Sequence, residues 1–363
     1  MKGEVALIFN LNANEVEEER SRWLHVLFPN SYPVLWCPIL SHYREDGTLD
    51  EVRIHSHMSW LSQWVKGWLV PSSTGDGWEM NSDEEDQWLD LLENLAPSLG
   101  ESWLWVGVLR ENVVHGVQRV KQLSARFPWK LGQTEPSPPR LGGKLTVCGV
   151  TVCPPTGAEL TQKKIQADLE TVAALGVPVC LYQLPQVTGN EVAPETFKNL
   201  TEHFGNLLAV KDSSGQDRLA VAMARQNSVL WLRGAEEGYL SWWKPTGGVY
   251  DGFLLSTANS LAVFYQAMLQ AQKEGDEATA KDLDQRLSRV ARRVFAVAGA
   301  VPFGNPFAHA NRALDHFFAF GRRALSIESP RSHNGVALPM ELLETTANAL
   351  AEVGWFPKKG YLE

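Results

Sequence analysis

Short apolar runs alternate with longer amphipathic segments along most of the chain, beginning near Ser31. Apolar runs of about four to eight residues are typical of buried strands, and apolar residues that recur every three or four positions are typical of helices. The pattern predicts strands at eight places: Val34–Ile39, Gly67–Val70, Trp103–Leu109, Leu145–Cys153, Val179–Tyr182, Leu207–Lys211, Val229–Leu232 and Gly252–Ser256. Repeated strand–helix units of this kind indicate a parallel sheet.

Helical spacing fills the segments between and after these strands. Ser82 precedes three acidic residues, which is typical of the start of a helix because acidic side chains stabilise its first turn. Helices are predicted over residues 50–65, 160–175, 194–203, 216–226, 261–275, 276–297, 306–319 and 340–353. The last four form an all-helical region after the final strand.

Eight strand–helix units over about 230 residues match the size of a (β/α)8 barrel. A doubly wound open sheet is the alternative, but it usually carries a glycine-rich nucleotide loop, and no G-x-G-x-x-G follows a predicted strand. We therefore predict an α/β protein, a (β/α)8 TIM barrel with a C-terminal helical extension. The expected parts are an N-terminal extension (1–30), the barrel (31–260) with an inserted loop at about 127–144, and a helical region (261–363).

Composition excludes several classes of function. The 363 residues include 33 Lys and Arg against 42 Asp and Glu, a net charge of −9 without a basic block, which argues against nucleic-acid binding. The apolar runs are far shorter than the ~20 residues of a membrane helix, and the N-terminus lacks the features of a signal peptide. The cysteines form no C-x-x-C pair and are predicted to be buried in a cytoplasmic protein. They are Cys37, Cys148, Cys153 and Cys180.

Two polar residues end predicted strands, where a barrel places its catalytic groups. Lys211 closes an apolar strand, and partial desolvation would favour the neutral amine that attacks carbonyls. An ordinary lysine that reaches solvent from a strand end is the alternative. Tyr182 also ends its strand and could relay protons, although a core tyrosine with its hydroxyl at the barrel rim would show the same pattern.

A hydroxyl-rich turn follows the second predicted strand. Ser72, Ser73 and Thr74 precede Gly75, and hydroxyls combined with backbone N–H groups suit a bound carboxylate. A polar turn that caps the next helix is the alternative interpretation.

Taken together, these segments resemble the dihydrodipicolinate synthase / N-acetylneuraminate lyase family of class I aldolases. STGDGWEMNSDEE is similar to the family's T-T-G-E turn, with Ser73 and Thr74 as the paired hydroxyls. VCLYQLPQVTG resembles the Y-N-x-P segment, with Tyr182 as its tyrosine, and LLAVKDSSG resembles K-D-x-S-G, with Lys211 as the Schiff-base lysine. GFLLSTANSLA resembles the eighth-strand segment, in which the carbonyl of Leu254 would face the substrate.

The resemblance runs from about Val34 to Arg331, and LSHYREDGTLD resembles the family's opening segment T-P-F-x-x-D-G-x-x-D. It implies a carbon–carbon lyase in which a 2-oxo acid such as pyruvate condenses with Lys211. Ser73 and Thr74 would hold the carboxylate, and Tyr182 would move the proton with help from Ser73. It also implies no cofactor and a homo-oligomer, a dimer or a tetramer.

Three departures from the family pattern point away from a true dihydrodipicolinate synthase. Pro155 and Thr156 stand where the synthases carry a second, proton-relaying tyrosine, and Gln183 replaces the asparagine after the first tyrosine. Val187 stands where an arginine grips the second substrate's carboxylate, which an apolar side chain cannot do. The alternatives are a non-catalytic descendant that binds an oxo acid or sugar acid, and a Schiff-base dehydratase or decarboxylase of a hydroxy-oxo acid.

The histidine pairs do not predict a metal site. His55 and His57 lie two positions apart in a predicted helix and would point in different directions. His309 and His316 share a helix face but lack an acidic third ligand in register. We therefore expect no metal.

Overall fold

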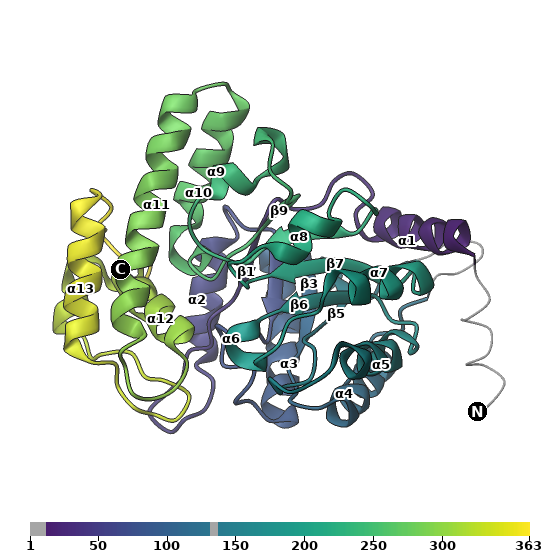
Figure 1. Ribbon diagram of the computed structural model, residues 1–363. Helices are drawn as coiled ribbons and strands as arrows, with labels where there is room; N and C mark the ends of the chain where they lie inside the picture. The colour runs from purple at the N-terminus through teal and green to yellow at the C-terminus, as the bar shows by residue number, and fades with distance from the viewer. Residues whose placement is uncertain (1–11, 131–136) are drawn as a thin grey trace. The chain divides into compact units, whose positions relative to one another are not determined.

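The computed structural model describes residues 12–130 and 137–363, with its elements labelled in Figure 1. Residues 1–11 of the predicted extension and 131–136 of the predicted inserted loop lie outside the described residues. The strands are β1 (Leu35–Pro38), β2 (Gly67–Val70), β3 (Ser102–Val108), β4 (Arg140–Leu141), β5 (Leu145–Val152), β6 (Val179–Gln183), β7 (Leu207–Asp212), β8 (Leu230–Arg233) and β9 (Gly252–Leu254). All eight predicted strands are confirmed.

The helices are α1 (Ala13–Leu27), α2 (Glu51–Leu61), α3 (Ser82–Leu99), α4 (Val113–Arg126), α5 (Gln162–Ala173), α6 (Pro185–Thr188), α7 (Pro194–His203), α8 (Arg218–Met223), α9 (Tyr239–Trp242), α10 (Ala258–Lys273), α11 (Glu277–Ala298), α12 (Pro306–Phe320) and α13 (Met340–Glu352). Short 3-10 helices follow at Lys244–Thr246 and Gly321–Ser326. Helix α4 falls where the sequence pattern names no helix.

The strands form one sheet in the order β3-β2-β1-β9-β8-β7-β6-β5-β4, and β3 also pairs with β5. The second pairing closes the eight parallel strands into a barrel, so the predicted (β/α)8 fold with C-terminal helices is confirmed. The short strand β4 is antiparallel to β5 and lies inside the predicted inserted loop.

The chain forms two compact units. The first unit comprises Met1–Val34, Glu101–Ala235 and Trp243–Phe253. The second unit comprises Leu35–Gly100, Glu236–Trp242 and Leu254–Glu363.

In the first unit, helix α1 is attached by one buried arginine. Arg20 is 1 % exposed, and its Nε donates to the Leu207 carbonyl at 3.0 Å. Its Nη2 donates to the carbonyls of Thr201 and Phe204 at 2.6 and 3.1 Å. One guanidinium therefore satisfies three backbone acceptors at the ends of α7 and the start of β7, which a buried interior requires.

In the second unit, strands β1 and β2 approach closely at Gly67. Gly67 pairs with Trp36, and a Cβ on Gly67 would lie 2.2 Å from the Trp36 ring, so only glycine fits. The C-terminal helices pack through aromatic contacts, among them Phe264 stacked on Trp355 with ring centroids 3.9 Å apart. Figure 1 shows α11 beside α13 within this helical region.

Two further expectations concern the chain as a whole. All four cysteines are free and buried, as predicted. Among the helices of the described residues, none combines the length and the apolar character needed to cross a bilayer.

Candidate functional site

Lys211 and Tyr182 lie side by side in the first unit, at the carboxyl ends of β7 and β6. The two residues are register partners, and Lys211 Nζ lies 3.9 Å from the centroid of the Tyr182 ring. Both side chains are buried, at 2 % and 3 % exposure. Lys211 is therefore an enclosed amine against a phenol ring and does not reach bulk solvent as a surface lysine would.

Gly234, which directly follows β8, provides space for the lysine. A Cβ at this position would lie 2.1 Å from Ser213 Oγ and 3.0 Å from Lys211 Cε. A larger residue at this position would therefore displace the side chain of Ser213 and crowd that of Lys211.

The loop after Lys211 is fixed by a buried ion pair. Arg233 donates to both carboxylate oxygens of Asp217, from Nε at 2.9 Å and from Nη2 at 3.1 Å, and Tyr250 Oη donates to Asp217 Oδ1 at 2.6 Å. The bidentate geometry is the strong form of the arginine–carboxylate interaction. It ties the start of α8 to the end of β8 and so holds the loop that follows the lysine.

Burial controls the protonation of the neighbouring groups. Desolvation raises the pKa of the Tyr182 phenol, the Cys153 charge would raise it further, and a contact with the Ser213 side chain opposes the shift. Desolvation also raises the pKa of the Cys153 thiol, against the lowering effect of Lys211. Both groups are therefore neutral near pH 7, and Tyr182 is a proton donor there. Cys153 is a neighbour of the lysine that sequence reasoning did not single out.

The residues that depart from the family pattern make contacts of their own. The Asn190 side chain donates to the Pro155 carbonyl at 2.8 Å. Thr156 donates from its backbone and its hydroxyl to the Glu111 carbonyl, at 2.9 and 3.2 Å. Val187 lies on α6 and is 39 % exposed. Gln183 exchanges two hydrogen bonds with the Val192 backbone.

In the second unit, the predicted hydroxyl turn follows β2 and is buried. Gly75 donates to Ser72 Oγ at 3.0 Å, and Ser41 Oγ donates to the Gly75 carbonyl at 2.7 Å. A Cβ on Gly75 would lie 2.4 Å from the Ile39 carbonyl, so the turn needs glycine here. The Asn305 side chain donates to the Ser73 carbonyl at 2.7 Å. Ser73 and Thr74 themselves are 3 % and 4 % exposed.

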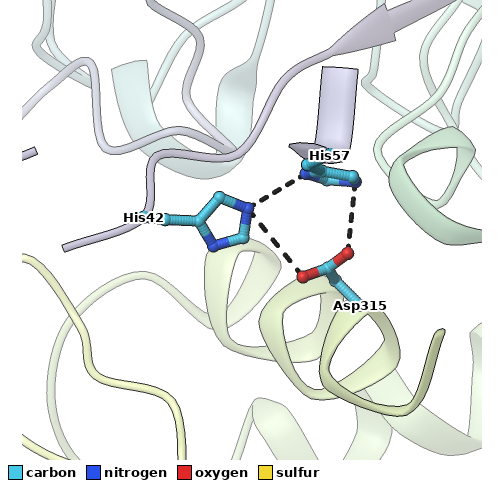
Figure 2. Close-up of side chains that lie close together, drawn as sticks. All are labelled: His42, His57 and Asp315. Carbon is cyan, nitrogen blue, oxygen red and sulfur yellow. Dashed lines mark hydrogen bonds and ion pairs between the residues drawn. The ribbon is translucent and has the colours of Figure 1, made fainter. Parts of the chain in front are cut away.

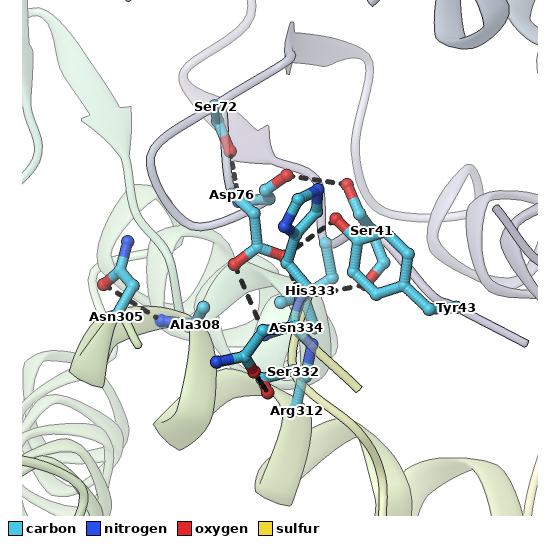
Figure 3. Close-up of polar contacts among 12 residues, drawn as sticks. Ser41, Tyr43, Ser72, Asp76, Asn305, Ala308, Arg312, Ser332, His333 and Asn334 are labelled. Atoms are coloured by element: carbon cyan, nitrogen blue, oxygen red, sulfur yellow. Dashed lines mark hydrogen bonds and ion pairs between the residues drawn. The ribbon is translucent and has the colours of Figure 1, made fainter. Parts of the chain in front are cut away.

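Asp76 extends this turn into a charged cluster, drawn in Figure 3. Its carboxylate pairs with Arg312 of α12 and accepts a hydrogen bond from Tyr43 Oη at 3.0 Å. Asp76 has a φ of 61°, in the left-handed region that few residues other than glycine adopt. Sequence reasoning did not identify Asp76, Arg312 or Asn305. The only available signal was the acidic residue at the fourth position of S-T-G-D.

Leu254, the remaining predicted residue, is the last residue of β9 and is fully buried.

A second acidic residue, Glu236, accepts hydrogen bonds from the segment that follows β9. Glu236 accepts hydrogen bonds from Ser256 Oγ at 2.8 Å and from Thr257 Oγ1 at 2.8 Å. It also accepts from the hydroxyls of Tyr239 and Tyr265, at 3.0 and 3.1 Å. Glu236 is a partly buried carboxylate that the sequence did not single out.

Comparison with known proteins finds that this chain is similar to aldolase-type enzymes. Residues 143–304 match the model of the dihydrodipicolinate synthetase family. A 4-hydroxy-tetrahydrodipicolinate synthase of Bartonella bacilliformis is 22 % identical over 262 residues, which cover 71 % of this chain and 81 % of that protein.

Solved structures share the fold. A prophage protein of E. coli K12 that belongs to the dihydrodipicolinic acid synthase family, determined in complex with pyruvate, superposes with a TM-score of 0.69 at 17 % identity, covering 89 % of this chain and 98 % of that chain. A variant of the 2-keto-3-deoxygluconate aldolase of Sulfolobus solfataricus superposes with a TM-score of 0.67 at 16 % identity, covering 88 % and 96 %.

The barrel and these matches support an aldolase-type lyase as the class of protein. The predicted resemblance to the dihydrodipicolinate synthase / N-acetylneuraminate lyase family is confirmed.

Proposed function

We propose that this protein is a class I aldolase that acts on a 2-oxo acid through a Schiff base on Lys211. The observation that carries the proposal is the pairing of a buried lysine with a buried tyrosine, 3.9 Å from Nζ to ring centroid, on neighbouring barrel strands. An enclosed amine attacks a carbonyl readily, and an adjacent phenol supplies the proton transfers that imine formation needs. The relatives' names add support, because both synthases and sugar-acid aldolases occur among them.

The chemistry follows from these two groups. Lys211 Nζ attacks the C2 carbonyl of the oxo acid, and the resulting hydroxyl leaves as water after it accepts the Tyr182 proton. The iminium then acts as an electron sink. The Tyr182 phenolate takes the proton of the C4 hydroxyl while the C3–C4 bond breaks, which releases an aldehyde and leaves an enamine. Protonation of the enamine at C3 and hydrolysis return the shorter oxo acid and free Lys211. Ser73 and Thr74 are proposed to bind the carboxylate, and the Leu254 carbonyl to face the substrate.

We do not assign dihydrodipicolinate synthesis. Thr156 directs its hydroxyl to the Glu111 carbonyl, and Pro155 has no hydroxyl, so neither replaces a relay tyrosine. Val187 has no positive charge that could bind the carboxylate of a second substrate. These residues favour a second substrate or product that lacks a carboxylate near Val187, such as a simple aldehyde.

Reductive trapping tests the Schiff base. We expect borohydride with pyruvate to leave one reduced adduct on Lys211, located by peptide mass spectrometry, and Lys211→Ala to show none. The half-exposed Lys198→Ala is the matched control and should trap like wild type. Absence of an adduct on wild type with pyruvate and with a panel of longer 2-oxo acids would contradict the proposal.

A second candidate is a non-catalytic oxo-acid or sugar-acid binding protein. The contacts that Pro155 and Thr156 make with other loops favour this function, because neither residue then supplies the second proton-relaying hydroxyl of the family pattern. Adduct formation or tight binding without conversion of any hydroxy-oxo acid would identify this function.

A third candidate is a Schiff-base dehydratase or decarboxylase of a hydroxy-oxo acid. Product analysis separates it from the aldolase, because aldol cleavage of the C3–C4 bond releases two organic fragments, whereas dehydration releases water and decarboxylation releases carbon dioxide.

We further propose a cytoplasmic protein that assembles as a dimer or tetramer. Four buried free thiols support a reducing compartment. The homo-oligomer rests on the family resemblance, and sedimentation of the purified chain would test it.

A further inference from the structure

We propose that His42, His57 and Asp315 form a binding site for one divalent metal ion of the Zn²⁺ type. The three residues belong to the second unit and come from three separate segments: the loop after β1, helix α2 and helix α12 (Figure 2). Each offers one ligand atom, and these atoms all lie within 4.8 Å of one another. Two imidazoles with one carboxylate are a donor set that Zn²⁺ uses in sites that keep a fourth position open.

Two of the distances between the ligand atoms lie near those of a tetrahedral ion. His42 Nε2 lies 3.0 Å from His57 Nδ1 and 3.8 Å from Asp315 Oδ2. Ligand atoms about 2.0–2.1 Å from a tetrahedral zinc are separated by roughly 3.4 Å, and the two observed distances lie on either side of that value. The metal would replace the one proton that the two imidazoles share, so only small side-chain movements are required.

The hydrogen bonds of His57 leave the correct nitrogen available. Its Nε2 lies 2.7 Å from the Asn259 carbonyl and 3.2 Å from Asp315 Oδ1, both acceptors, so Nε2 carries the proton. Nδ1 then presents its lone pair to His42. A second ring nitrogen that donates to a backbone carbonyl is the usual support of a metal-bound histidine.

Asp315 has capacity for a further partner. It is 1 % exposed, pairs with Arg53 through Oδ2 and accepts a hydrogen bond from Tyr361 Oη at 2.9 Å through Oδ1. An ionised carboxylate has about four lone-pair sites, so Arg53 and a metal can share it. The Arg53 guanidinium also lies over the rings of Phe320 and Tyr361, at 5.0 and 5.1 Å from the ring centroids. These ring contacts help to hold Arg53 beside Asp315, so Arg53 does not need a second carboxylate oxygen.

A cavity gives the site an entrance and a place for a fourth ligand. His42, Arg53 and Asp315 line a pocket of about 250 Å³ that also carries the acidic residues Glu45 and Asp50. The volume holds several waters, one of which could complete the coordination. The pocket is also lined by Arg44, Arg312, Arg331 and Glu328, so it holds four carboxylates, Asp315 among them, and four arginines.

Metal titration of the full-length chain, free of any affinity tag and stripped with a chelator, tests the site. We expect one equivalent of Co²⁺ to bind with the visible absorption bands of a tetrahedral ion, one equivalent of Zn²⁺ to displace it, and Zn²⁺ to raise the Tm. His42→Gln should weaken binding by at least about tenfold to a hundredfold. His55→Gln, on the exposed face of helix α2, which also carries His57, is the matched control and should bind like wild type.

Failure of the folded wild-type chain to bind Co²⁺ or Zn²⁺ at one equivalent would overturn the proposal. Equal affinity in His42→Gln and wild type would also overturn it. Asp315→Asn provides a second ligand variant if His42→Gln does not fold, with circular dichroism as the check on folding. None of these measurements involves an oxo acid, so their outcome is independent of the function proposed for Lys211.

Discussion

Lys211 meets Tyr182 because the register of two strands shifts by one residue. Val179 pairs with Leu207, but Cys180 pairs with Ala209, and the irregularity between them brings Tyr182 opposite Lys211. Side chains alternate between the faces of a strand, so a one-residue slip would direct the lysine to the opposite face of the sheet. The site therefore depends on a local bulge as well as on the residues themselves.

Tyr182→Phe is predicted to separate the two roles of this side chain. The phenyl ring keeps the packing beneath Lys211, but the proton donor is lost, so kcat should fall by about 10²- to 10⁴-fold. The borohydride-trapped adduct should still form, although more slowly. Steady-state kinetics together with trapping yields provide the measurement. Unchanged kcat in Tyr182→Phe would remove Tyr182 from the proton path.

Single residues were predictable from the sequence where they interrupted an apolar strand. Lys211 and Tyr182 were found in this way, because a polar residue at the end of an apolar run can be recognised from the sequence alone. Asp76 and Arg312 were not found, because the two partners lie 236 positions apart and each resembles an ordinary surface charge in the sequence. His42 was missed for the same reason, since its partners lie on α2 and α12.

At the level of elements, apolar runs located the eight barrel strands to within two residues at each end. Helix α4 was not named because Gly116 and four valines in its first eight residues lower helix propensity. Its buried face, including Val120 and Leu123, shows that tertiary packing stabilises it instead. The short strand β4 lies in a segment rich in proline and glycine, which favours a loop interpretation over a strand.

Helix α1 is predicted to depend on its buried arginine. Arg20→Ala should lower the free energy of unfolding by about 3 kcal/mol, because three buried carbonyls lose their donor. Urea unfolding followed by circular dichroism measures the loss. Arg22→Ala, on the exposed face of the same helix, should change stability by no more than about 0.5 kcal/mol. Equal effects of the two substitutions would contradict an anchoring role for Arg20.

For the molecule as a whole, a buried histidine makes stability depend on pH. Burial lowers the pKa of His309, whose Nε2 donates to the Phe303 carbonyl at 2.7 Å. The unfolded chain therefore binds the proton more readily than the folded chain. The stability that His309 contributes is fully present above its unfolded pKa of about 6.5 and is lost as the pH falls below that value.

We accordingly predict that the free energy of unfolding decreases between pH 7 and pH 5, and that His309→Gln decreases less over this interval. Urea unfolding at several pH values in this range provides the comparison. His55→Gln, an exposed histidine, should retain the wild-type slope. A slope in His309→Gln as steep as that of wild type would refute the assignment to His309.

The division of the chain into two units has a consequence for how the protein is made. The first unit is interrupted twice and is completed only by Trp243–Phe253, whereas the second unit takes two segments from between the parts of the first unit and one from after them. On a ribosome, the first unit cannot finish folding until residue 253 has emerged, and the second unit also needs the residues that follow it. Strands β1 and β2 therefore emerge long before the later segments of their unit, and contacts between such distant segments form slowly during folding.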